Sequence, residues 1–152
     1  MCTSFMGELL TATHNFGTAP IRAATTADTF KGALYLASAT VNASTTAYSS
    51  TGEVTGTNYT AGGVAVTNAT APTSTNSSST AGVAYWTPSA SLTYTSVTLA
   101  TSFDAVLIYN SSQSNKAVSV HTFGSQTITA GTFTLTMPSN TTTTALLRLA
   151  TT

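Results

Sequence analysis

The sequence is poor in charged side chains, which make up 5% of its 152 residues, against about 25% in an average soluble domain. Four bases and four acids give a formal net charge of zero. Binding to phosphate backbones needs clustered Lys and Arg, so we do not expect a nucleic-acid partner. Net charge also keeps free monomers apart in solution, so this neutral chain favours burial in an assembly. An exported β-domain rich in Thr and Ser is the alternative interpretation.

Cysteine and long apolar runs are also scarce. Cys2 is the single cysteine, which excludes an intrachain disulfide and a cysteine-based zinc site within one chain. No segment approaches the run of about 20 apolar residues that a membrane-spanning helix needs, so no membrane partner is expected. The first residues, MCTSFMGELLTATHNF, lack a basic start and contain Glu8, unlike a signal peptide. We therefore expect synthesis in the cytoplasm, with export only by a route such as packaging into a particle.

Groups that could carry catalysis are few and scattered. His14 falls on an expected helix and His121 on an expected strand, whereas a metal site needs several converging ligands. Asp104 could reach His121 across a hairpin, but an ordinary strand histidine is the favoured interpretation. The sequence predicts no catalytic, cofactor-binding or metal-binding residue, and we expect a protein that is not an enzyme.

The glycine-rich stretch TAYSSTGEVTGTNYTAGG, residues 46–63, could be mistaken for a ligand-binding loop. A phosphate loop needs a lysine after its glycines, and a dinucleotide site needs a following helix; this stretch has neither. We expect the glycines to supply turn positions with positive φ. Glu53 would then pair with a base or cap a turn, and Tyr48 and Tyr59 would pack beside the loop.

One segment has the spacing of a helix. Phe5, Leu9, Ala12 and Phe16 fall on one face of a 3.6-residue period. The helix within residues 1–17 would be short and marginal alone, so it must pack on its own domain or on a neighbouring subunit.

The remaining chain has the period of two residues that is typical of strands. In SLTYTSVTLA the apolar face changes between Tyr94 and Val97, which indicates a bulge or a strand buried on both sides. Apolar residues on both faces of AVLIY predict a central strand, and NSSQSN predicts the hairpin turn that follows it. In ALLRLA, Leu147 and Leu149 are predicted to point inward and Arg148 outward. Further strands are expected in FKGALYLA, in GVAVTNAT, from Lys116 to Phe123 and in GTFTLTM.

Together these patterns predict an all-β fold, an antiparallel β-sandwich of jelly-roll or Ig-like type with a short N-terminal helix. We expect a single domain over residues 1–152. It would comprise a helix or arm at 1–17, the sandwich at 28–150 and a flexible Ser/Thr-rich loop at 70–82.

The aromatic pair in VAYWTPS, Tyr85 and Trp86, could form a stacking platform for a sugar or fill a core or an interface. No pair of acids at glycosidase spacing accompanies it. We expect an assembly interface to use the apolar helix face together with this pair. The predicted interface residues are Phe5, Leu9, Phe16, Tyr85 and Trp86.

Three segments carry a resemblance to a known family. They are TFKGALYLASATVNASTTAYSSTGEVTGTNYTAGGVAVT, DAVLIYNSSQSNKAVSVHTFGS and GTFTLTMPSNTTTTALLRLA. In this order, after an N-terminal SF…ELL…HNF segment, they resemble a family of small structural proteins from tailed bacteriophages. The resemblance spans most of the chain outside residues 70–82. The chain departs from the family pattern at His121-Thr122-Phe123, where many relatives carry an Asp before Phe-Gly.

The resemblance implies a virion structural protein. In its sharpest form this is a capsid decoration (cement) protein on the outer capsid surface, often a homotrimer, which bridges capsomers. Its expected partners are the major capsid protein and further copies of itself. The alternative is a host-receptor or carbohydrate-binding β-sandwich module of the head fibre or tail.

Overall fold

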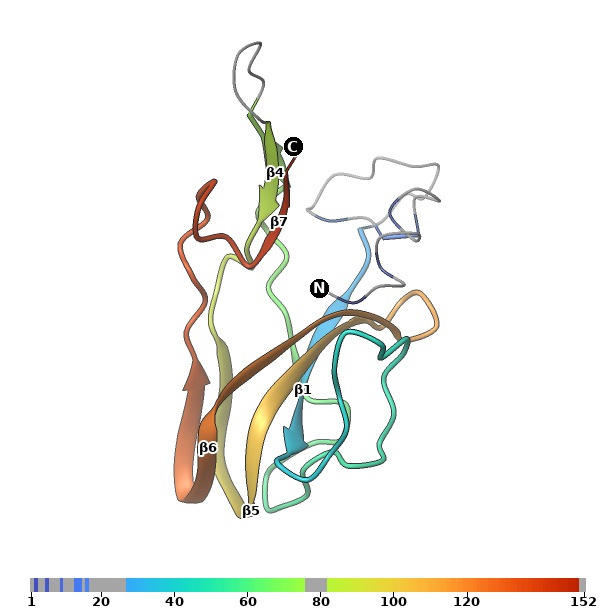
Figure 1. Cartoon of the computed structure of the whole chain (residues 1–152). Helices are drawn as coiled ribbons and strands as arrows, with labels where there is room; N and C mark the ends of the chain where they lie inside the picture. The colour runs from blue at the N-terminus through green and yellow to red at the C-terminus, as the bar shows by residue number, and fades with distance from the viewer. Residues whose placement is uncertain are drawn as a thin grey trace.

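The computed structural model describes residues 2, 5, 9, 13–14, 16, 27–75 and 82–150. Strands in this part of the chain form two antiparallel sheets (Figure 1). The larger sheet has the order β2-β1-β5-β6 and contains β1 (Phe30–Leu36), β2 (Val64–Ala65), β5 (Leu92–Asn110) and β6 (Lys116–Leu135). The smaller sheet has the order β3-β4-β7 and contains β3 (Thr73–Ser74), β4 (Val83–Trp86) and β7 (Leu147–Ala150). The prediction of an all-β antiparallel fold is confirmed.

A long hairpin of β5 and β6 dominates the larger sheet. The sequence pattern divides this region into shorter strands, but the structure joins them into strands of 19 and 20 residues. The pairing register shifts at several points, first between Tyr94 and Val97, and Ser96 has a φ of 52°. The expected bulge is therefore present at the change of face. Because bulges bend strands and increase their twist, the hairpin folds over at its middle (Figure 1).

The two halves of the bent hairpin face each other as layers. The Tyr94 hydroxyl, in the first half of β5, donates a 2.8 Å hydrogen bond to the carbonyl of Gly32 in β1. Phe133, near the end of β6, packs edge-on against Phe103 of β5 with 5.2 Å between ring centroids. One half of the bent hairpin thus packs over the sheet that the other half forms with β1.

The centre of the core lies where β5 passes between β1 and β6. Val106, Leu107 and Ile108 are buried, and β5 pairs with β1 on one side and β6 on the other. AVLIY is therefore a central strand, as predicted. The predicted turn is also present, because β5 ends at Asn110 and β6 begins at Lys116.

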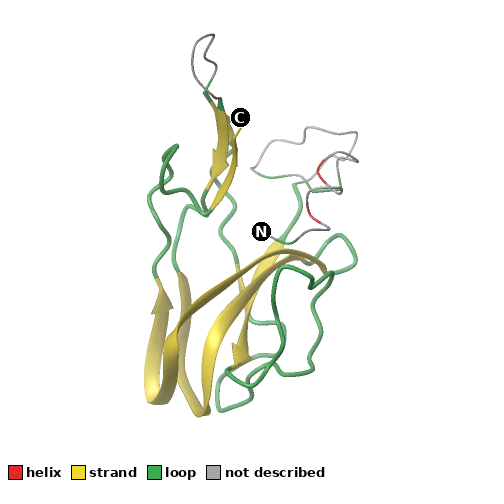
Figure 2. Cartoon of the chain, viewed as in Figure 1, coloured by secondary structure: helices red, strands yellow, loops and turns green. Residues whose placement is uncertain are grey.

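Two predicted segments need comment. Within the expected loop at 70–82, Thr73–Ser74 pairs with β4 as strand β3, so this part is a strand rather than a loop, and 76–81 lie outside the described residues. The predicted N-terminal helix also falls mainly outside them. The chain between β1 and β2 is drawn as loop (Figure 2). In the described part, no helix has the length and apolarity needed to cross a membrane.

Candidate functional site

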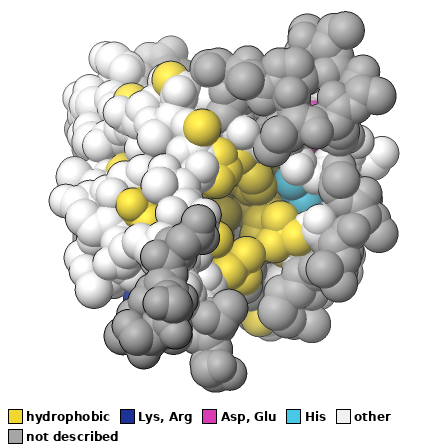
Figure 3. Space-filling view, turned by 90° about the horizontal axis from the view of Figure 1, so that it is seen from above, with side chains coloured by type: hydrophobic (Ala, Val, Ile, Leu, Met, Phe, Trp, Pro, Cys, Tyr) yellow, Lys and Arg dark blue, Asp and Glu magenta, His cyan; other side chains and the backbone are white. Residues whose placement is uncertain are grey.

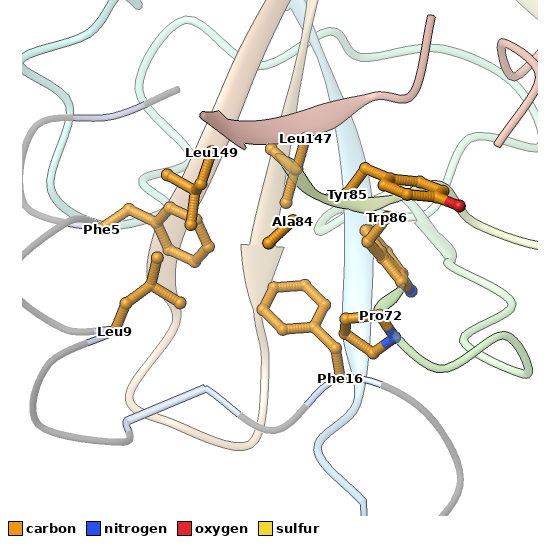
Figure 4. A pocket seen from close by; sticks show the side chains of 9 residues that line it. All are labelled: Phe5, Leu9, Phe16, Pro72, Ala84, Tyr85, Trp86, Leu147 and Leu149. Carbon is orange, nitrogen blue, oxygen red and sulfur yellow. The ribbon is translucent and has the colours of Figure 1, made fainter. Parts of the chain in front are cut away.

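An apolar pocket of about 100 Å³ opens beside the smaller sheet. Figure 3 shows apolar side chains gathered in a hollow at this end of the molecule. The side chains around the pocket come from β4, β7, the segment before β3 and the N-terminal segment (Figure 4). They are Phe5, Leu9, Phe16, Pro72, Ala84, Tyr85, Trp86, Leu147 and Leu149.

The alternation of β7 explains how it contributes to the pocket. Successive side chains of a strand point to opposite faces, so Leu147 and Leu149 both line the pocket while Arg148 between them is exposed. The Arg148 Nε donates a 2.6 Å hydrogen bond to the carbonyl of Thr142, away from the pocket lining. Strand β4 places Trp86 opposite Leu147 in the ladder. The small sheet therefore forms one wall of the pocket.

Trp86 forms part of the buried base of the pocket. Its side chain is 2% exposed, and its ring centroid lies 4.7 Å from that of Phe16. The indole Nε1 donates a 2.8 Å hydrogen bond to the carbonyl of Thr70, which satisfies its polar group. With the ring packed in this way, Trp86 offers no open face for sugar stacking and acts as core filler.

Leu149 stands at the rim. It lies on the same face as Leu147, as predicted, but it is 42% exposed, whereas Leu147 is 8% exposed. An exposed leucine beside an apolar pocket is the arrangement expected at a contact surface.

The structure brings all the predicted interface residues together. Phe5, Leu9, Phe16, Tyr85 and Trp86 each line this one pocket. The sequence pattern missed the contributions of Pro72, Ala84 and β7, because the pairing of β4 with β3 and with β7 brings these segments to one place.

A buried polar cluster ties the N-terminal segment to the hairpin. The Asn110 side-chain amide lies 3.1 Å from His14 Nδ1 and donates a 2.9 Å hydrogen bond to Asp28 Oδ2. Gln113 donates to the other oxygen of Asp28 at 3.1 Å. The His14 ring is 4.8 Å from that of Phe5, which lines the pocket. Three separate segments, at 14, 28 and 110–113, supply this cluster, so no spacing in the sequence could reveal it.

The structure does not join His121 to Asp104. His121 lies opposite Val106 in the ladder, and its Nε2 is 2.9 Å from the hydroxyl of Ser119. Burial lowers the pKa of His121 from its ordinary value. Across the described residues, no group of three or more His, Cys, Asp and Glu side chains is placed to hold a metal ion.

Glu53 is buried in the glycine-rich loop, and its hydrogen-bond partners are neutral donors; of the two expected roles, pairing with a base or capping a turn, its contact with the Gly62 N–H fits the second. Its Oε2 accepts a hydrogen bond from the Tyr48 hydroxyl at 2.7 Å. Its Oε1 accepts from the Tyr59 hydroxyl at 2.8 Å and from the Gly62 backbone N–H at 2.7 Å. The tyrosines therefore do more than pack beside the loop: they bind its only acid.

The glycines of this loop mostly act as predicted. Gly52, Gly62 and Gly63 have positive φ. At Gly63 the backbone also passes so close to β1 that an added Cβ would lie 1.8 Å from the carbonyl of Gly32. The loop is thus built to lie against the sheet.

Comparison of the chain with protein-family models, with curated proteins and with solved structures finds no match. The resemblance to small tailed-phage proteins therefore rests on the sequence motifs.

Proposed function

We propose that this chain is a structural component of a tailed-bacteriophage virion, without enzymatic activity. In its sharpest form it is a capsid decoration protein that binds the major capsid protein on the outer shell as a trimer and bridges capsomers. The proposal is supported by the sequence motifs, by the near absence of charge and above all by the open apolar pocket with its exposed rim at Leu149.

The pocket is suited to hold an anchoring side chain of a partner. A volume of about 100 Å³ is comparable to cavities that accept one small apolar group. Buried apolar anchors in such pockets carry much of the energy of a protein interface. A leucine, methionine or phenylalanine from a capsid subunit is therefore the chemistry that fits.

The edge of the small sheet adds a second means of attachment. Strand β7 pairs with β4 on one side and has no other partner strand in the described part of the chain. An open edge can accept an extended segment of another protein through main-chain hydrogen bonds. With about 800 Å² buried per partner, such a contact reaches the usual size of a specific interface, and repetition over the shell multiplies its effect.

Co-sedimentation with empty shells tests the proposal. We expect the purified chain to sediment with shells and Leu149→Asp to lose most of this binding, because it places a charge at the apolar rim. Thr127→Asp is the matched control, because it adds the same charge at an exposed position of β6. Equal binding by both variants, or binding of the chain to host cells but not to shells, would favour a host-receptor or carbohydrate-binding module instead.

A further inference from the structure

A second cavity, of about 470 Å³, lies between two parts of the loop that follows β1. Its volume falls in the range of about 300–1,000 Å³ that is usual for small-molecule sites, whereas the apolar pocket measures about 100 Å³. The first wall of this cavity lies within residues 38–45 and the second within residues 47–52, and Tyr35 of β1 also lines it. The cavity shares no lining residue with the apolar pocket.

Backbone hydrogen bonds hold both walls of the cavity against the strands. Just before the first wall, the Ala37 N–H donates to the carbonyl of Ser102 in β5 at 3.0 Å. Within the second wall, the Tyr48 N–H donates to the carbonyl of Asn115 in the hairpin turn at 2.9 Å. Because both walls are anchored in this way, the cavity is already formed before a ligand enters, which lowers the cost of binding.

The two walls meet beside the end of β1. The Leu36 N–H donates to the carbonyl of Gly52 at 2.9 Å. An added Cβ at Gly52 would lie 2.7 Å from the Cβ of Ala39, so only a residue without a side chain lets the walls approach this closely. The Tyr35 hydroxyl donates to the carbonyl of Ser49 and so ties β1 to the second wall. The cavity is therefore closed on this side.

The polar side chains that line the cavity are neutral hydroxyls. Those of Ser38, Thr40 and Thr51 make no hydrogen bond to another described residue. The Ser49 hydroxyl accepts from the Thr51 N–H at 3.2 Å and still has its own O–H to donate. None of the described residues around the cavity is an acid, a base or a histidine. Since a charged ligand would lose hydration here without gaining an opposite charge, the lining favours an uncharged one.

Small apolar groups lie among these hydroxyls. They belong to Ala39, Val41 and Ala47. A sugar ring has the matching chemistry, because it carries hydroxyls around its edge and C–H groups on its faces. A peptide strand is a poorer fit, because the Leu36 N–H and the Leu34 carbonyl, at the adjacent edge of β1, are already bonded within the chain.

We propose that this cavity binds a neutral saccharide. Thr40 of the first wall and Thr51 of the second exchange hydrogen bonds with the hydroxyls of the ligand from opposite sides. The sequence placed a possible sugar platform at Tyr85 and Trp86, but the Trp86 ring is packed in the core. The saccharide site lies elsewhere, and it does not depend on the proposed role in a virion.

Binding of the labelled chain to an array of immobilised neutral and acidic oligosaccharides is the first test. We expect binding to neutral members and weaker or no binding to acidic members of similar structure. An NMR titration with a neutral oligosaccharide that binds should shift the amide signals of Ser38, Thr40 and Thr51. Failure to bind any neutral member, no preference for neutral over acidic members, or amide shifts elsewhere in the chain would overturn the proposal.

Two variants test the hydroxyls directly. Thr40→Val and Thr51→Val keep the shape of exposed side chains whose hydroxyls have no partner in the described part of the chain, so the fold should be unaffected. Each should weaken saccharide binding by about three- to tenfold, the loss expected for one hydrogen bond, and the double variant should bind more weakly still. Thr127→Val is the matched control at an exposed position of β6 and should bind like the wild type. Undiminished binding by the double variant would contradict the proposal.

Discussion

The hydroxyl of Tyr59 donates a 2.8 Å hydrogen bond to Glu53 Oε1, and its oxygen also accepts a 3.0 Å hydrogen bond from the Leu34 N–H. Tyr59→Phe would leave both groups without a partner, at a cost of about 2–4 kcal/mol in the free energy of unfolding. Tyr48→Phe should cost about 1 kcal/mol, because the Tyr48 hydroxyl is less deeply buried than that of Tyr59 and makes one hydrogen bond where that of Tyr59 makes two. Urea denaturation of the two variants measures the difference. If both variants lose the same free energy of unfolding, the hydrogen bonds of Tyr59 are no stronger than that of Tyr48.

Alkaline solution should unfold the protein cooperatively. The pKa of Tyr109 is raised by burial to about 12, and the pKa values of Tyr35, Tyr48, Tyr59 and Tyr94 are also raised, mainly by burial. Because these phenols ionise more easily in the unfolded chain, stability is complete below about pH 10 and is lost as the pH rises through the folded values.

Tyrosinate absorbance and circular dichroism, followed together against pH, check this prediction. We expect most of the tyrosinate absorbance to appear in the same sharp transition as the loss of β-sheet signal. A broad titration near pH 10 that precedes unfolding would contradict the burial of this cluster.

Gly63 should be intolerant of any side chain. Its φ is +73°, and an added Cβ would lie 1.8 Å from the carbonyl oxygen of Gly32. The backbone at Gly63 or at Gly32 would therefore have to shift to make room for Gly63→Ala. We expect a loss of about 3 kcal/mol or more, or failure to fold. Gly124→Ala is the matched control, since nothing lies within 4 Å of its added Cβ, and its unfolding free energy should change by less than about 1 kcal/mol. Thermal unfolding of both variants tests this contrast.

The base and rim of the pocket should respond differently to substitution. Trp86→Ala removes a buried ring and should cost about 3–5 kcal/mol of stability. Leu149→Asp changes a side chain that is 42% exposed and should cost less than about 1 kcal/mol in the isolated chain. Chemical denaturation compares them. If Leu149→Asp unfolds the chain, Leu149 belongs to the core and its loss of shell binding would carry no information about docking.

Local sequence patterns predicted the elements of the larger sheet well. The change of face between Tyr94 and Val97 corresponds to a real bulge, and AVLIY is a central strand. The continuity of β5 was missed, because polar residues at 101–102 interrupt its apolar pattern. They lie in the register shift between the pairs Leu99–Ile128 and Phe103–Gln126, and pairing on both sides of the shift, which leaves no local signal, makes β5 one strand.

The candidate site was predictable only in part. The helical spacing of Phe5, Leu9 and Phe16 and the aromatic pair at 85–86 identified residues that meet at one pocket. Strand alternation placed Leu149 on the correct face, but its exposure was not predictable, because alternation gives the face of a side chain and not how much of the molecule covers it. The donors around Glu53 were missed for a similar reason, since turns with positive φ fold the loop back on itself.

The most direct test of the account is the copy number of this chain in purified particles, measured against the major shell protein. The account predicts one copy per shell subunit, or one trimer at each local three-fold position. Absence from particles that are otherwise complete, or a few copies confined to the tail, would contradict a role as capsid decoration.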